Sequence, residues 1–154
     1  MIRMYNEVVT EQDTVLWCGD AFFGRECENP SDVLRRLNGY KILVKGNHDK
    51  SQAVMAAMGF DMVLTECVLH IAGRACKVSH FPYEGIEHSR EGGDSHRKDK
   101  FKSIRPKRVK GEVLIHGHTH SNKKRQGNCI HVGVDAWAYK PAPMAAVAAL
   151  VAQV

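Results

Sequence analysis

Five side chains of the types that bind divalent cations follow apolar runs or glycines in this chain. They are Asp20, Asn47, His80, His118 and His120. Mixed carboxylate, amide and imidazole ligands suit a pair of cations about 3.5–4 Å apart, which hold a phosphate group and lower the pKa of a bridging water. Gly19, Gly46 and Gly117 permit the tight turns that such a site needs. The five residues therefore supply the ligand types that a pair of cations needs for in-line attack of a metal-activated hydroxide on a phosphoester.

Each of these residues also has a plain structural interpretation. Asp20 and Asn47 are residue types that commonly cap turns. His80 could be a strand-end histidine that bonds to the backbone, and His118 and His120 could be turn histidines that bind no metal. Their ordered succession at strand ends favours the ligand interpretation.

The remaining histidines are assigned other roles. His70 lies inside an apolar run and is expected to be structural, whereas His116 and His131 are candidates for fixing the orientation of the ligands. His88 and His96 lie in a polar stretch, where a solvated loop histidine is the favoured interpretation over a replacement ligand.

Apolar periodicity predicts the elements that would position the candidate ligands. Strands are expected at Thr14–Cys18, Tyr40–Val44, Met62–Ile71, Ala75–Ser79, Glu112–Ile115 and Cys129–Val134. Helices are expected within Met1–Thr10 and at Pro30–Leu37, Ser51–Met58 and Ala145–Val154, the last with a strand as the alternative. Because polar residues follow the strands, the sequence predicts an α/β fold with its site at strand ends.

Length and composition predict a single globular domain over residues 1–154, since 154 residues with 44% hydrophobic and 25% charged side chains suffice for one core. No apolar run is long enough to span a bilayer, and the start of the chain lacks the pattern of a signal peptide. Five cysteines without a CxxC pair favour reduced thiols. We therefore expect a cytoplasmic protein with no membrane partner.

A long polar loop is predicted at about 82–111, and its block Arg97–Lys110 accounts for much of the net charge of +5. Such a block favours polyanions such as nucleic acid, and the alternative is a solvated loop. Phe101 is the only aromatic residue in the block, so base stacking is not supported.

Four motifs in order resemble those of the calcineurin-like metallophosphoesterases, in particular the small bacterial and phage members. They are Gly19-Asp20, Gly46-Asn47-His48-Asp49, His80 and Gly117-His118-Thr119-His120. The resemblance implies a sandwich of two mixed β-sheets flanked by helices. It also implies that Asp20 bridges two metals, with Asn47, His80 and His118 completing one site and His120 binding the other metal.

The same resemblance makes His48 the general acid near the leaving oxygen, oriented by Asp49. It implies a phosphomonoester or phosphodiester substrate and divalent metal ions. Mn²⁺ is the expected ion, and Zn²⁺, Fe and Ni²⁺ also suit these ligands.

The chain departs from the family at its start, because the first strand and its Asp-x-His motif are missing. No histidine precedes Asp20, and Asp13 stands at the wrong end of its strand. The second metal site is therefore predicted to be incomplete, with only Asp20 and His120 from this chain.

Three explanations are open: the coding sequence continues upstream of Met1 or is truncated, which we favour, another chain supplies the strand, or the protein is degenerate. A missing strand would leave an apolar slot and allow self-association. The alternative function is a catalytically impaired single-metal protein that holds polyanions on its basic loop.

Overall fold

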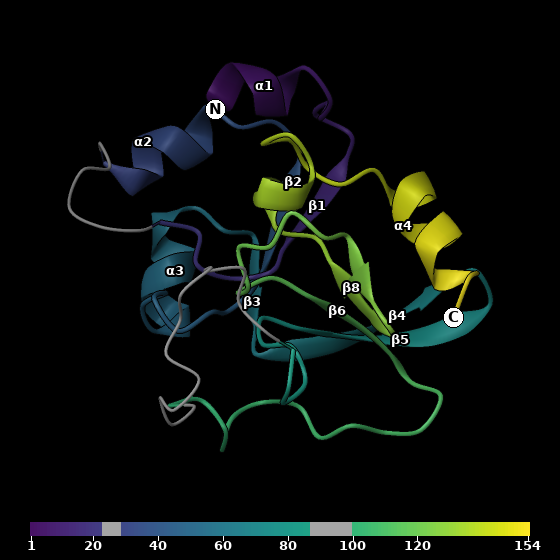
Figure 1. Ribbon diagram of the computed structural model, residues 1–154. Helices are drawn as coiled ribbons and strands as arrows, with labels where there is room; N and C mark the ends of the chain where they lie inside the picture. The colour runs from purple at the N-terminus through teal and green to yellow at the C-terminus, as the bar shows by residue number, and fades with distance from the viewer. Residues whose placement is uncertain (23–28, 87–99) are drawn as a thin grey trace.

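The structure is a computed structural model of residues 1–154, and residues 1–22, 29–86 and 100–154 are described (Figure 1). The helices are α1 (Ile2–Asn6), α2 (Pro30–Arg35), α3 (Gln52–Met58) and α4 (Met144–Val151), with a 3-10 helix η1 at Val134–Ala136. The strands are β1 (Thr14–Trp17), β2 (Tyr40–Val44), β3 (Met62–Leu64), β4 (Glu66–Ile71), β5 (Arg74–Ser79), β6 (Val113–His116), β7 (Arg125–Gln126) and β8 (Cys129–His131).

Two sheets form the centre of the molecule. The smaller has the strand order β1-β2-β3, and its neighbours pair in parallel. The larger has the order β4-β5-β6-β8-β7, in which β5, β6 and β8 run parallel while β4 and β7 pair antiparallel. The predicted α/β fold with two sheets flanked by helices is confirmed, and the mixture of directions lies in the larger sheet.

The alternation of side chains along β1 shows how the layers are held together. Leu16 packs into the cluster between the two sheets, which α4 also covers, whereas Val15 and Trp17 pack with α1 and α2 on the outer face. Successive strand residues point to opposite faces, so one short strand contributes to both cores. Figure 1 shows α1, α2 and α3 on one side of the sheets and α4 on the other.

Capping residues fix where two of the predicted helices begin. The Asn29 side chain accepts a hydrogen bond from Ser31 N, and Pro30 occupies the first helical position. The Ser51 hydroxyl accepts from Val54 N at the start of α3. These caps set the register of the helices that follow β1 and β2.

Two predicted strands are wrong in extent. The run Met62–Ile71 is two strands that separate at Thr65, because β3 bonds to β2 in one sheet and β4 bonds to β5 in the other. The run Cys129–Val134 stops at His131, since the backbone turns at Gly133 into η1. A periodic apolar pattern does not reveal where a chain changes sheets.

The remaining expectations concern the C-terminal segment, the long loop, self-association and membrane spans. The C-terminal segment is helical, as favoured, and the described parts of the 82–111 loop contain no helix or strand. Arg97, His88 and His96 lie outside the described residues. Within residues 1–22, 29–86 and 100–154, β1 pairs with β2 alone, and self-association along its other edge stays a prediction. No helix in the described part of the chain is both long and apolar enough to cross a membrane.

Candidate metal centre

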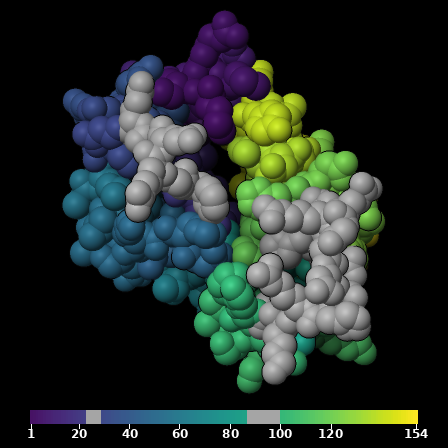
Figure 2. All heavy atoms as spheres, turned by 60° about the vertical axis from the view of Figure 1, so that its left-hand side comes forward, coloured from purple at the N-terminus to yellow at the C-terminus, as the bar shows by residue number. Residues whose placement is uncertain are grey.

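The candidate ligands come from four strand ends that belong to different sheets. Asp20 follows β1 and Asn47 follows β2 in the smaller sheet, while His80 follows β5 and His118 follows β6 in the larger. Figure 2 shows the two halves of the chain side by side, one purple to blue and the other green to yellow. The site is therefore assembled where the carboxyl ends of both sheets meet.

Four possible metal-ligand atoms lie close together, and one of them is Nε2 of His80. This Nε2 atom lies 3.1 Å from Asn47 Oδ1, 3.0 Å from His118 Nδ1 and 3.4 Å from Asp20 Oδ2. The ligand atoms of Asp20, His80 and His118 all lie within 4.8 Å of one another. The structure thus brings together the four residues predicted to form one complete metal site.

The orientation of the His80 ring is fixed by the backbone of β1. His80 Nδ1 donates its hydrogen to the carbonyl oxygen of Cys18 over 2.7 Å, and the ring is buried. In the neutral imidazole the other nitrogen then carries a lone pair rather than a hydrogen. Nε2 is consequently an acceptor that points at the centre of the cluster.

These atoms fit a divalent cation better than they fit one another. In the neutral His80 ring, Nε2 is a lone-pair acceptor, as are Asn47 Oδ1 and Asp20 Oδ2, so these two contacts bring like partial charges together. A cation bound to all three atoms would replace the two repulsive contacts with ligand bonds. Two imidazoles, a carboxylate and an amide oxygen form a donor set that suits Mn²⁺ or Zn²⁺.

Asp49 holds the loops that carry two of the ligands. One of its carboxylate oxygens accepts the N–H groups of Asp20 and Gly46 over 2.9 and 2.8 Å, and the other accepts that of Ala21 over 2.9 Å. Charge-assisted bonds of this kind are among the stronger ones in proteins. Asp49 therefore fixes the backbone after β1 against the backbone after β2.

Asp20 is kept ionised in this setting. Burial acts to raise the pKa of its carboxyl group, but the neighbouring His80 ring and the hydrogen bond from the His48 N–H outweigh burial, and the pKa is lowered overall. The bond from His48 N to Asp20 Oδ1 measures 2.9 Å. A charged carboxylate is the form that binds a cation.

The loops approach so closely that side chains are excluded at two positions. A Cβ atom on Gly46 would lie 2.2 Å from Asp20 Oδ1, and one on Gly19 would lie 2.3 Å from His80 Nδ1. Three candidate ligands also have positive φ angles, namely Asp20 at 52°, His118 at 62° and His120 at 50°. Strained backbone of this type gathers at functional sites.

Two phenylalanines form an aromatic wall around His118. The ring centroids of Phe81 and Phe101 lie 4.8 and 5.3 Å from that of His118, and 5.1 Å from each other. Beside this wall a cavity of about 450 Å³ is lined by Gly46, Phe81 and Lys45, among others. The ligand histidine is thus packed on its apolar side, with an open space next to the cluster.

His120 and His48 lie at the margin of the cluster. The His120 side chain is 71% exposed, and its Nδ1 lies 3.4 Å from Asp135 Oδ2. Among the described residues the only group of three metal-binding side chains is Asp20, His80 and His118. His48 is exposed and contributes its backbone N–H to Asp20.

His116 and His131 lie behind the ligands as a buried pair with ring centroids 5.3 Å apart. Burial lowers the pKa of His116 to about 4, and burial also lowers the pKa of His131 despite the nearby Asp135 carboxylate. Both rings are therefore neutral at pH 7, and their predicted part in orienting the ligands stays a prediction.

Sequence reasoning missed three contributors to this site. The Cys18 carbonyl is a backbone group, so no residue type signals its bond to His80. Phe81 carried one usable signal, because it directly follows His80. Phe101 precedes His118 by 17 positions, and nothing in the sequence indicated that the two rings are in contact.

Comparison with known proteins identifies the family. A model of the calcineurin-like phosphoesterase superfamily domain matches residues 2–137. The chain belongs to this superfamily. The resemblance seen in the ordered motifs is therefore confirmed for the fold and the family.

Two viral relatives of this phosphoesterase-superfamily chain are similar over most of its length. The gene 66 protein of Mycobacterium phage L5 is 32% identical over 160 residues, which cover 89% of this chain and 72% of that protein. The gene 66 protein of Mycobacterium phage D29 is 30% identical over 157 residues, with coverage of 89% and 74%.

A solved structure shares the fold of this superfamily member. The crystal structure of a protein of unknown function from Aquifex aeolicus aligns with a TM-score of 0.67 and 25% identity, covering 97% of this chain and 82% of that chain. None of these names states a substrate, so the reaction of this chain is argued from its site.

Proposed function

We propose that this chain is a metal-dependent phosphoesterase that hydrolyses phosphomonoesters or phosphodiesters. The observation that carries the proposal is the convergence of Asp20 Oδ2, Asn47 Oδ1 and His118 Nδ1 on His80 Nε2. We further propose Mn²⁺ as the ion, because it accepts mixed oxygen and imidazole ligands. A bound divalent ion would supply Lewis-acid polarisation of the phosphate and a water of lowered pKa.

The residues of the chain have distinct tasks in this proposal. Asp20 offers a carboxylate that the His48 N–H and His80 keep ionised. His80 is held in one tautomer by the Cys18 carbonyl, so its ligand atom needs no rearrangement before binding. Preorganisation of this kind keeps the reorganisation cost low in the reaction.

His48 is the proposed general acid for the leaving oxygen. Its backbone is fixed to Asp20, and its side chain is exposed. Asp49 contributes by holding the backbone on which both residues depend. An exposed imidazole near the cluster suits proton donation, because histidine is the side chain that most often acts as a general acid in enzymes.

Hydrolysis of bis(4-nitrophenyl) phosphate with added Mn²⁺ tests the proposal. We expect a rate that is lost in Asn47→Ala and His118→Ala and that is kept in His70→Ala. His70 is the matched control because it is an exposed histidine on β4, outside the cluster. Equal rates in the wild type and in Asn47→Ala would contradict the enzyme proposal.

The second candidate function is a single-metal binding protein with impaired catalysis. The observation that favours it is the exposure of His120 and its contact with Asp135, away from the one cluster found among the described residues. Metal analysis after dialysis tests the incomplete second site: one ion per chain agrees with it, and two tightly held ions would contradict it. The hydrolysis assay above separates the two candidate functions.

A reducing compartment such as the cytoplasm is the proposed setting of this activity. The cysteines at positions 18, 67, 76 and 129 are free thiols, and burial raises the pKa of each. A raised pKa keeps these thiols protonated and therefore less reactive. Free thiols are typical of proteins in reducing compartments, where disulfides are rare.

A further inference from the structure

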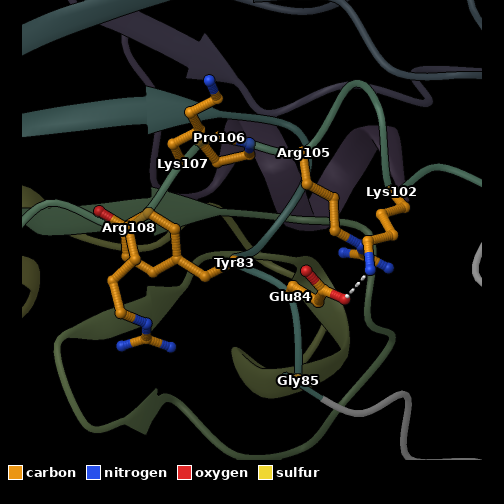
Figure 3. Close-up of a pocket in the computed structure, with 8 residues that line it drawn as sticks. All are labelled: Tyr83, Glu84, Gly85, Lys102, Arg105, Pro106, Lys107 and Arg108. Atoms are coloured by element: carbon orange, nitrogen blue, oxygen red, sulfur yellow. Dashed lines mark ion pairs between the residues drawn. The ribbon is translucent and has the colours of Figure 1, made fainter.

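A basic groove of about 490 Å³ lies between residues 83–85 and residues 102–108 (Figure 3). Four cationic side chains line it, namely Lys102, Arg105, Lys107 and Arg108, against the single carboxylate of Glu84. Lys102 pairs with Glu84 over 2.9 Å, which leaves an excess of positive charge in the groove. A concave surface with charge of one sign attracts ligands of the other sign.

The floor of the groove is a buried tyrosine that holds one of the arginines. Tyr83 is only 1% exposed, and its hydroxyl donates to Glu112 Oε2 over 2.7 Å. The Arg108 guanidinium lies 4.7 Å from the centre of the Tyr83 ring and donates to Asn128 Oδ1 over 3.0 Å. Arg108 is therefore positioned before any ligand arrives.

The same burial decides what the groove can recognise. Because the Tyr83 ring lies beneath Arg108, it offers no face on which a base could stack. The available groups are guanidinium and ammonium donors, and these match phosphate oxygens. The groove can thus grip a phosphate but has no aromatic platform for a base.

The groove is built from the segments that also build the metal centre. Tyr83 lies three residues after His80, so their Cα atoms are at most about 11 Å apart. Lys102 directly follows Phe101, whose ring contacts His118. Arg105 donates to Pro82 O over 3.2 Å and so joins the two segments.

We propose that this groove binds a second phosphate of the substrate, the backbone phosphate of a nucleic-acid strand whose neighbouring phosphodiester reaches the metal centre. The reaction at the metal centre rests on the function proposed above, whereas binding in the groove does not require it. A strand fits because the cations follow one another along residues 102–108 and the groove is open. Recognition is independent of sequence.

The test is binding of fluorescein-labelled dT12 to the full chain in EDTA, measured by anisotropy. Hydrolysis is absent under these conditions, so a failure of the proposed reaction does not affect the result. Lys107→Gln and Arg108→Gln remove one groove cation each. Lys110→Gln is the matched control, because Lys110 is an exposed lysine of the same loop that does not line the groove.

We expect each groove variant to weaken binding by roughly fivefold and to reduce the slope of log K against log salt by about 0.7, the value for one lost phosphate contact on a single strand. Lys110→Gln should change the affinity by less than about twofold, and dA12 should bind as tightly as dT12. Equal losses in all three variants would overturn the proposal, since they would indicate diffuse attraction.

Two further arms keep the result interpretable. Arg108→Gln removes the contact with Tyr83, so its thermal unfolding is measured as well. If it does not fold, Lys107→Glu decides, because Lys107 makes no hydrogen bond or ion pair with another described residue. Pyrophosphate is also added at a concentration equal to that of dT12. If it displaces dT12, the groove binds phosphate but its ligand is a free polyphosphate, which would contradict the nucleic-acid strand proposed here.

Discussion

His80 Nδ1 donates its hydrogen to the Cys18 carbonyl oxygen over 2.7 Å, and this bond joins the end of β5 to the end of β1. It connects the two sheets at the point where the candidate ligands meet. It also leaves Nε2 of the neutral ring free of hydrogen and directed at Asp20, Asn47 and His118. One backbone carbonyl thus sets both the place and the chemical state of a ligand atom.

Removing the His80 ring should remove metal affinity. We expect His80→Ala to weaken Mn²⁺ binding by at least about 100-fold, because even the partners of metal ligands contribute about 10–100-fold. The measurement is competition with a metal-sensitive dye at pH 7.5. His70→Ala should bind like the wild type, and an equal loss in that exposed control would show that the effect is not specific to the cluster.

The three hydrogen bonds that the Asp49 carboxylate accepts should be weakened when one of its oxygens is replaced by an amide nitrogen. Asp49→Asn replaces one of two oxygens that together accept three N–H groups, so we expect the free energy of unfolding in EDTA to fall by about 2 kcal/mol. Asp61 accepts one backbone N–H, from Lys41, and an amide oxygen can replace that acceptor. Asp61→Asn should therefore cost less than about 1 kcal/mol in the same urea titration.

The contact between the loops after β1 and β2 should not tolerate a methyl group. In Gly46→Ala the new Cβ would lie 2.2 Å from Asp20 Oδ1 and 2.6 Å from Asp20 N, so we expect a loss of about 2–3 kcal/mol and weaker metal binding. Gly73→Ala meets no atom within 4 Å and should cost only about 1 kcal/mol for its positive φ. Metal affinity unchanged in Gly46→Ala would contradict the packing described for this site.

Much of this arrangement could be predicted from the sequence because ligand types directly follow apolar runs. Asp20, Asn47, His80 and His118 were placed at strand ends, and parallel neighbours bring such ends to one edge. The helix starts at Ser51 and Pro30 likewise had local signals. Local patterns therefore sufficed where neighbouring residues determine the structure.

The remainder depends on partners that are distant in sequence. Thr65 separates β3 from β4, which the sequence predicted as one strand. The two strands belong to different sheets because β3 pairs with β2 and β4 pairs with β5, and these partners lie outside the run Met62–Ile71 in sequence. The acceptance of three backbone N–H groups by Asp49 depends on where two other loops lie. Neither relationship leaves a periodic or compositional mark.

The buried pair behind the site should make stability depend on pH. The pKa of His116 is about 4 in the folded chain because of burial, and that of an unfolded histidine is about 6.5. Below about pH 6.5 the unfolded chain binds a proton that the folded chain excludes, so the free energy of unfolding falls until about pH 4.

His116→Leu should reduce this fall. We expect the loss of unfolding free energy between pH 7.5 and pH 5 to be smaller by about 2 kcal/mol than in the wild type, measured by urea titration in EDTA. His70→Leu is the control, since His70 is exposed. An identical pH dependence in His116→Leu and the wild type would show that His116 is not held neutral by burial.

The central claim is that Asp20, Asn47, His80 and His118 form one complete site for a divalent cation. Its most direct test is the number of Mn²⁺ ions retained per chain after dialysis, in the wild type and in His118→Ala. We predict one ion per chain in the wild type and none in the variant. A wild-type chain that retains no ion, or a His118→Ala chain that retains as many, would contradict the account.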